Sequence, residues 1–221
     1  EDQTVEIKLG NVVMNNSSAA EKGTGYFKKR IEGAFVKPEM SAITVTVKGA
    51  GSAEKGTLAS PSWGAVYWQY FEDLDLVSKA ATPLSIDKQL FVEKNSDRGP
   101  VITPLSAGTI LKPGDKIKVR IELKVDRDME YVHMKDLRAS ALEPVNVISG
   151  YKWQGGLGYY ESTKDISTSF YFSYLRRGTY VFEYPLFVTH TGNFSNGITT
   201  VQSMYAPEFS AHSQGTRITV E

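Results

Sequence analysis

Three histidines and many serines and carboxylates give this 221-residue chain the residue types of a Ser–His–acid hydrolase. The histidines are His133, His190 and His212, far apart in the sequence. Such a triad depends on geometry, and the sequence contains no Gly-x-Ser-x-Gly elbow that would present a nucleophile. We therefore interpret the histidines as ordinary strand and loop residues, and we predict no catalytic residue and no enzyme activity.

Acidic side chains cluster between two expected strands, at Asp126, Asp128 and Glu130, with His133 close by. A hard-cation loop would need a glycine at its sharp turn, and none is present here. The chain also has no cysteine, which excludes disulfides, thiolate zinc sites and a cysteine nucleophile. We interpret the cluster as a charged connection that keeps the end of a sheet soluble, and we predict neither a metal site nor a cofactor.

Aromatic residues are dense in the stretch from Trp63 to Phe71. Such rings could form a stacking platform for a sugar or for single-stranded nucleic acid. Because they occur on both faces of the expected strand, packing against a neighbouring domain is the favoured interpretation. The candidate packing or stacking aromatics are Trp63, Tyr67, Trp68, Tyr70 and Trp153.

The glycine-rich segment 155–158 resembles a phosphate-binding loop only in composition. A dinucleotide fingerprint needs a strand before it and a helix after it, and Tyr159 and Tyr160 follow instead. We predict a plain surface loop. With 25 basic and 25 acidic residues, the chain also has no charge excess that would favour nucleic acid or a membrane surface.

No apolar run approaches the about 20 residues of a membrane helix, and no signal peptide is evident. The chain begins at Glu1 rather than Met, so we expect a processed form or a fragment of a longer protein.

The elements that must position these residues are predicted to be strands. Between Lys116 and Val125 every second residue is apolar and the intervening ones are charged, which indicates a strand with one buried face. The same alternation runs from Tyr180 to Val188. Shorter expected strands cover 5–9, 25–31, 43–48, 65–71, 86–93, 130–137, 168–174, 198–205 and 217–220, with at most a short helical turn around 74–81.

About a dozen short strands separated by turns are typical of an all-β protein, here an antiparallel β-sandwich of the macroglobulin or immunoglobulin-like kind. A small polar segment, 79–83, suggests a boundary near residue 82. Residues 1–82 hold few strands for a closed sandwich, so we expect a β-rich linking segment whose domain is completed by upstream residues. Residues 83–221 hold enough strands for a complete sandwich.

The second block resembles the last macroglobulin-like domain of bacterial alpha-2-macroglobulin-like proteins, particularly the large Bacteroidetes type. The most diagnostic segment is Ser203-Met204-Tyr205-Ala206-Pro207-Glu208-Phe209. The other segments that carry the resemblance are 88–92, 111–116, 119–133, 143–146, 178–184 and 192–197. Residues 1–82 match by position, as the segment that follows the thioester domain in that family.

The resemblance implies a broad-spectrum protease trap in the bacterial cell envelope, periplasmic or at the surface. In that family a reactive thioester captures the attacking protease. This chain has no cysteine, so no catalytic residue carries over to it. The implied role is a structural module that packs on the thioester domain and shields it, with other domains of its own chain as partners and target proteases reached through the parent protein. A carbohydrate- or cell-surface-binding sandwich remains the alternative.

Overall fold

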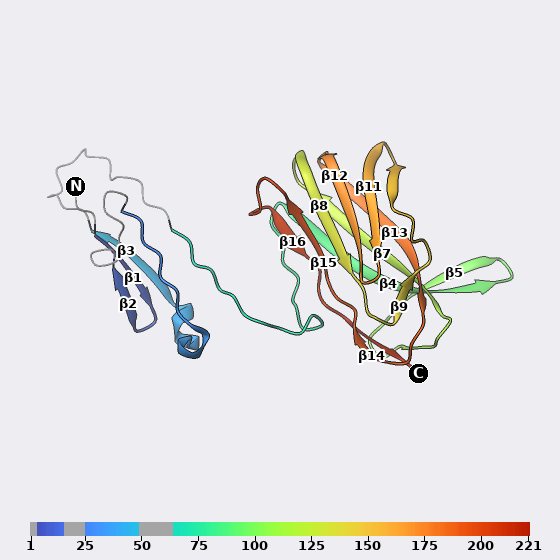
Figure 1. The fold of residues 1–221 in the computed structure, drawn as a ribbon, viewed down its shortest axis with the longest axis horizontal. Coiled ribbons are helices and arrows are strands. Elements are labelled where there is room, and N and C mark those ends of the chain that lie inside the picture. The colour runs from blue at the N-terminus through green and yellow to red at the C-terminus, as the bar shows by residue number, and fades with distance from the viewer. Residues whose placement is uncertain (1–3, 16–24, 49–63) are drawn as a thin grey trace. The chain divides into compact units, whose positions relative to one another are not determined.

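The chain forms two compact units, residues 1–68 and residues 69–221. The structure is a computed structural model that describes residues 4–15, 25–48 and 64–221 (Figure 1). Residues 69–82 lie with the second unit, and the backbone of Ala80 pairs with that of His212. Whether 1–82 and 83–221 are separate folding domains stays a prediction.

The first unit contains a small antiparallel sheet of order β2-β1-β3. Its strands are β1 (Thr4–Leu9), β2 (Val12–Asn15) and β3 (Ile43–Lys48), accompanied by two 3-10 turns, η1 (Gly33–Phe35) and η2 (Pro38–Ser41). The register places apolar residues side by side on one face of the sheet. This open apolar face consists of Val5, Ile7, Leu9, Val12, Met14, Ile43, Val45 and Val47.

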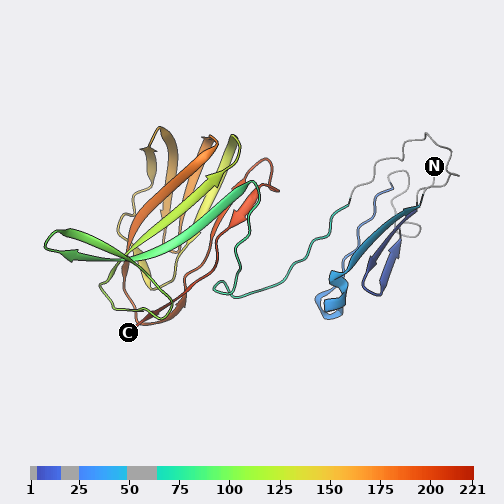
Figure 2. The same cartoon turned by 180° about the vertical axis from the view of Figure 1, so that it is seen from behind.

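The second unit is a sandwich of two main antiparallel sheets (Figures 1 and 2). The six-stranded sheet contains, in order, β10 (Gly150–Gln154), β11 (Leu157–Lys164), β12 (Ser167–Leu175), β8 (Met129–Leu137), β15 (Thr199–Ser203) and β16 (Ser210–His212). The five-stranded sheet contains β5 (Gly99–Pro104), β4 (Leu84–Ser96), β7 (Lys116–Val125), β13 (Gly178–Val188) and β9 (Leu142–Pro144). A small third sheet joins β14 (Gly192–Ser195), β17 (Arg217–Val220) and β6 (Ile110–Leu111).

The core of the second unit lies between the two main sheets. The predicted inward residues of β7 are all buried, from Ile117 to Val125. Phe170 and Phe172 of β12 meet Phe182 of β13 across the interior, with ring centroids 5.3 and 5.5 Å apart. The prediction of an all-β antiparallel sandwich is therefore confirmed.

Two local predictions are wrong. Residues 25–31 and 65–71 form no strand, because no neighbouring strand among the described residues supplies the hydrogen bonds that a sheet needs. The short turn expected around 74–81 is present at 74–76. After it, Ala80 and His212 exchange two backbone hydrogen bonds of 3.1 and 3.0 Å, which hold the end of this segment extended beside β16.

In the described part of the chain, no helix is long and apolar enough to cross a membrane.

Candidate functional site

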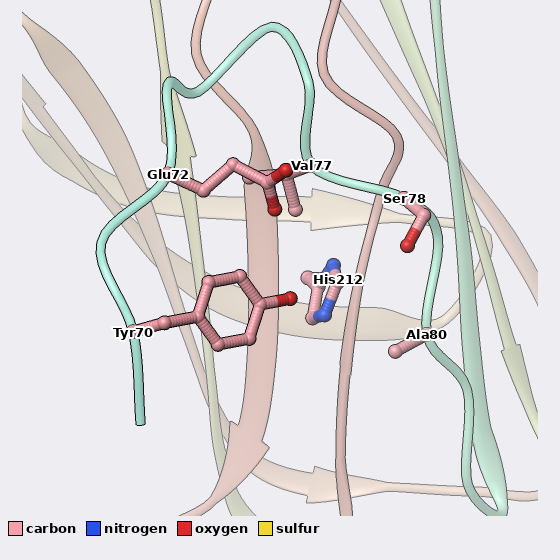
Figure 3. A pocket seen from close by; sticks show the side chains of 6 residues that line it. All are labelled: Tyr70, Glu72, Val77, Ser78, Ala80 and His212. Atoms are coloured by element: carbon pink, nitrogen blue, oxygen red, sulfur yellow. The ribbon is translucent and has the colours of Figure 1, made fainter. Parts of the chain in front are cut away.

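A pocket of about 400 Å³ lies between residues 70–80 and β16 (Figure 3). Gly215 permits this arrangement, since a β-carbon there would lie 1.8 Å from the carbonyl oxygen of Leu74. The Gly215 N–H donates to the Val77 carbonyl at 2.9 Å, and Arg217 pairs with Asp75 at 3.1 Å. These contacts place the lining side chains Tyr70, Glu72, Val77, Ser78, Ala80 and His212.

The pocket brings a serine, a histidine and a carboxylate to one place but does not connect them. Among the described residues no hydrogen bond joins Ser78, His212 and Glu72, and the His212 Nδ1 instead lies 3.3 Å from the Ser213 carbonyl oxygen. A nucleophile needs a base within hydrogen-bond reach before it can be activated. The arrangement therefore gives no positive evidence for hydrolase chemistry.

The acidic connection between β7 and β8 is occupied by internal contacts. Asp126 pairs with Arg127 at 2.9 Å, while Asp128 accepts hydrogen bonds from the Tyr174 hydroxyl at 2.6 Å and from the Arg177 N–H at 2.7 Å. These two donors, the tyrosine first, lower the pKa of Asp128. Within residues 4–15, 25–48 and 64–221, no group of three His, Asp or Glu side chains is placed to hold a metal ion.

The five aromatics predicted from the sequence do not form one site. Trp63 lies outside the described residues. Tyr67 and Trp68 belong to the first unit and are 83% and 55% exposed. Tyr70 lines the pocket beside β16, whereas Trp153 lies on β10, and these strands form opposite edges of the six-stranded sheet.

Trp153 lies flat on a glycine of the neighbouring strand. It pairs with Gly158 across β10 and β11, and a β-carbon on Gly158 would lie 2.8 to 3.1 Å from three atoms of the indole ring. The turn between the strands uses Gly155 and Gly156, both with positive φ, so the glycine-rich segment is a tight hairpin. The sequence prediction named Trp153 but missed the glycine that supports it.

An aromatic row continues from β10 across the outer surface of the sheet. Tyr151, Tyr160, Tyr171 and His133 are successive cross-strand partners on β10, β11, β12 and β8. Tyr171 and His133 are stacked with centroids 4.6 Å apart, and Tyr151 meets Tyr160 edge-on at 5.2 Å. Alternating aromatics in the two strands flanking the Gly-Gly turn could have indicated part of this row.

A second exposed cluster, the Tyr131 tip, consists of Tyr131, Met204 and Tyr205. Among described residues other than glycine, Tyr131 alone has a positive φ, of 51°. Its carbonyl accepts the Met204 N–H at 2.9 Å, and its ring meets that of Tyr205 edge-on at 5.2 Å. The three side chains are 51, 61 and 81% exposed. A strained backbone therefore presents an apolar cluster at the end of the sheet.

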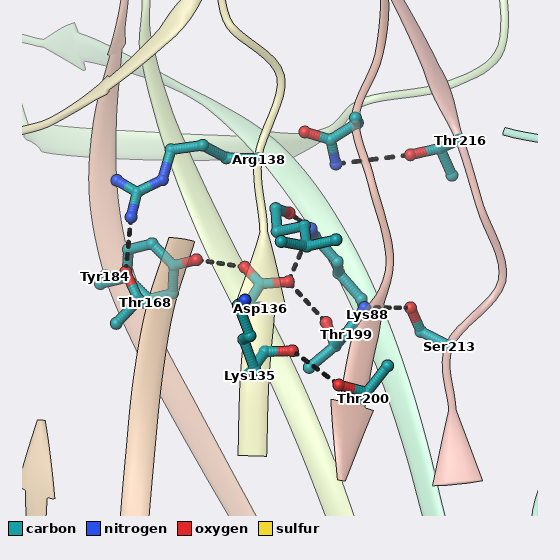
Figure 4. A network of polar contacts seen from close by, with 12 residues as sticks. Lys88, Lys135, Asp136, Arg138, Thr168, Tyr184, Thr199, Thr200, Ser213 and Thr216 are labelled. Atoms are coloured by element: carbon teal, nitrogen blue, oxygen red, sulfur yellow. Dashed lines mark hydrogen bonds and ion pairs between the residues drawn. The ribbon is translucent and has the colours of Figure 1, made fainter. Parts of the chain in front are cut away.

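A buried polar network ties the two sheets together (Figure 4). Asp136 of β8 is fully buried and accepts hydrogen bonds from Thr199 at 2.6 Å and from the hydroxyl of Tyr184, and it pairs with Lys88 at 2.7 Å. Burial, followed by the charge of Asp136, raises the pKa of Tyr184 well above its usual range. Nearby Arg138 donates to Thr168 at 2.8 Å. Asp136, Lys88, Thr199 and Tyr184 bond to one another, which indicates a structural role, whereas the Nε and Nη1 atoms of Arg138 have no hydrogen-bond partner among the described residues.

Residues 84–208 match the family described as the bacterial alpha-2-macroglobulin MG10 domain, which is more than half of the chain. The chain belongs to this family. No curated protein matches it. The chain is also similar to a mutant of Salmonella alpha-2-macroglobulin, with 15% identity and a TM-score of 0.51, covering 98% of this chain and 13% of that one.

Two Escherichia coli structures show the same similarity in fold. One is trypsin-activated alpha-2-macroglobulin, with 15% identity and a TM-score of 0.51 over 66% of this chain and 11% of that one. The other spans domain MG7 to the C-terminus, with 15% identity and a TM-score of 0.50, over 65% of this chain and 24% of that one. The chain thus spans a quarter or less of these relatives. The MG10 resemblance is confirmed, while the Bacteroidetes type stays a prediction.

Proposed function

We propose that this chain is the non-catalytic C-terminal structural module of an alpha-2-macroglobulin-like, broad-spectrum protease inhibitor. The module packs against the thioester domain of its parent protein and shields it. The MG10 match over residues 84–208 supports this role. All 221 residues lack cysteine, so under this proposal the thioester belongs to another part of the parent.

The observation that carries the proposal is the Tyr131 tip. Monomeric proteins seldom leave contiguous apolar groups exposed without a binding role. Met204 and Tyr205 follow β15, which pairs with β8, and the Met204 N–H donates to the carbonyl of Tyr131 in β8. A rigid apolar cluster of this kind can cover a reactive group on a neighbouring domain and exclude water from it.

A shielding role requires contacts that differ between the native and the protease-cleaved states of the parent. The test uses the full-length parent and measures the rate at which methylamine reacts with the thioester. We expect Tyr205→Ala to raise this rate, because the amine gains access once the ring is removed. Ile148→Ala is the matched control, since Ile148 is 76% exposed and lies in the connection between β9 and β10. Equal rates in the parent and in Tyr205→Ala would contradict shielding.

The partners of the module under this proposal are other domains of its own chain, with target proteases reached only through the parent. The parent is a protein of the bacterial cell envelope, periplasmic or at the surface. The module itself performs no catalysis, and the unconnected Ser78, His212 and Glu72 are consistent with that role.

The open apolar face supports a domain that is completed by upstream residues. Ile43, Val45 and Val47 remain 45, 58 and 45% exposed although they share one face of the sheet. A half-sandwich of this composition is expected to bury that face against a second sheet. Strands that precede residue 1 in the parent would supply it. Expressing residues 1–68 with and without the preceding parent segment, and comparing their thermal unfolding, tests this. A cooperative transition without that segment would contradict it.

A further inference from the structure

The outer surface of β10, β11 and β12 carries an unusual set of side chains. Outward positions are recognised because the alternating residues Tyr159, Phe170 and Phe172 are buried in the core. We call the exposed or half-exposed outward set the aromatic face; its members are Tyr151, Trp153, Gly158, Tyr160, Ser162, Lys164, Tyr171 and Ser173. The aromatic face contains no aliphatic side chain, and its one charged side chain, Lys164, lies at the end of β11.

We propose that the aromatic face binds a neutral oligosaccharide, with Trp153 as the stacking platform. This inference does not depend on the proposed inhibitor role. The indole of Trp153 rests on Gly158 with one side and is 80% exposed, so its other side is open to solvent. A flat indole of this kind suits the apolar C–H face of a sugar ring, which packs on aromatic surfaces through dispersion and weak C–H contacts.

Hydrogen-bonding groups with unused capacity surround the platform. Among the described residues, the hydroxyls of Tyr151, Tyr160 and Tyr171 make no hydrogen bond, in contrast to those of Tyr174, Tyr180 and Tyr184. Sugar hydroxyls both donate and accept, as phenol and serine hydroxyls do. The three tyrosines lie on adjacent strands about 4.8 Å apart, so the row spans about 10 Å. That length suits an oligosaccharide better than a single sugar.

The charge and composition of the face favour this ligand over others. A polyanionic glycan or a nucleic acid would need several basic side chains, and the aromatic face has one, Lys164 at the end of β11. Tyrosine and tryptophan are also enriched at protein interfaces, so packing of another domain is an outcome that the test must separate. The flat, open indole and the hydroxyls without partners among the described residues favour the sugar. The observations therefore favour a neutral sugar chain.

The test is calorimetric titration of the 221-residue chain with cellohexaose and chitohexaose, and with a heparin oligosaccharide as the charged comparison. We expect a neutral hexasaccharide to bind, and Trp153→Ala to weaken that binding about tenfold or more. Gly158→Ala keeps the tryptophan but places a methyl group 2.8 Å from its ring, so the indole must lift from its flat position. We expect this variant to weaken binding about threefold or more.

Trp68→Ala is the matched control, because Trp68 is an exposed tryptophan of the first unit without a supporting glycine. It should leave the affinity unchanged, and thermal unfolding of each variant verifies that the chain is folded. The proposal is overturned if the folded chain binds neither neutral hexasaccharide, if Trp153→Ala binds as tightly as the unaltered chain, or if only heparin binds. It also fails if the preceding domains of the parent bind through Trp153 while no neutral sugar does, since the face is then a domain-packing surface.

Discussion

The two outer surfaces of the sandwich differ although the strands beneath them follow the same alternation. The outward side of the five-stranded sheet, here called the charged face, carries paired ions on β4, β7 and β13. Its members include Glu93, Lys116, Lys118, Arg120 and Glu183. The aromatic face of the six-stranded sheet has rings and hydroxyls at equivalent outward positions.

The two faces differ in whether their polar groups have partners within the protein. Glu93 contacts Lys116 at 2.6 Å and Lys118 at 3.4 Å, and these partners, Lys116 first, lower the pKa of Glu93. Arg120 pairs with Glu183 at 2.5 Å. The hydroxyls of the aromatic face have no such internal partners. The charged groups of the first face therefore already have partners, whereas the hydroxyls of the aromatic face can still form hydrogen bonds to a ligand.

We expect the largest loss of stability from a substitution in the buried polar network between the two sheets. Asp136→Asn keeps the shape of the side chain but leaves buried Lys88 without a counter-ion. We expect a loss of about 3–5 kcal/mol in the free energy of unfolding, measured with urea. The double variant Lys88→Met/Asp136→Leu should recover only part of that loss, because it removes the buried charge but leaves the hydroxyls of Thr199 and Tyr184 without their acceptor. A loss below about 1 kcal/mol for Asp136→Asn would contradict a structural role for the network.

A smaller effect is expected from interrupting the aromatic row. Tyr171→Ser removes the ring stacked on His133 and exposes its neighbour on β8. We expect a loss of about 1 kcal/mol, the usual contribution of a cross-strand aromatic pair. Tyr151→Ser should cost less, since Tyr151 is 80% exposed. Equal losses for the two variants would show that the stack adds nothing.

Lowering the pH should destabilise the folded chain through protonation of His133, a member of the same aromatic row. Burial, and then the positive charge of Lys135, lower the pKa of His133, whose ring contacts Tyr171 and whose cross-strand partner is Gln202. The folded state therefore binds a proton less readily than the unfolded state. The contribution of His133 is fully present above its ordinary pKa of about 6.5 and is lost as the pH falls below that value. His133→Asn should reduce the change of the unfolding midpoint with pH between about pH 7 and pH 5. An unchanged slope would exclude His133 as the titrating group.

The smallest effect is expected on the charged face. Glu183→Gln removes one partly exposed ion pair and should cost no more than about 1 kcal/mol, with the difference shrinking as salt is added. Tyr171→Ser should show no comparable salt dependence. Measuring the free energy of unfolding of both variants at low and high sodium chloride tests this difference between the two faces. A salt-independent loss for Glu183→Gln would mean that packing of Arg120 on Phe91, 4.7 Å from the ring centroid, matters more than the charge.

Part of the site could be predicted from the sequence. Alternation in β7 identified its buried side, and the aromatic count singled out Trp153. The prediction failed for 65–71, where aromatic residues favour a strand but no strand among the described residues pairs with them. It also missed Tyr131, because a tyrosine with positive φ is set by the surrounding sheet and not by the preference of the residue itself.

The sequence by itself determined the sides of β7 and β13 that face the core, the turn at Gly155 and Gly156, and the absence of thiol chemistry. These follow from the chain itself, through the two-residue period, the φ freedom of glycine and the residue inventory. Only the tertiary structure decided which outward side chains meet. His133 lies beside Gln202, and Trp153 lies on Gly158, because strand register sets cross-strand neighbours. Register depends on the fit of the whole core, which no local segment contains.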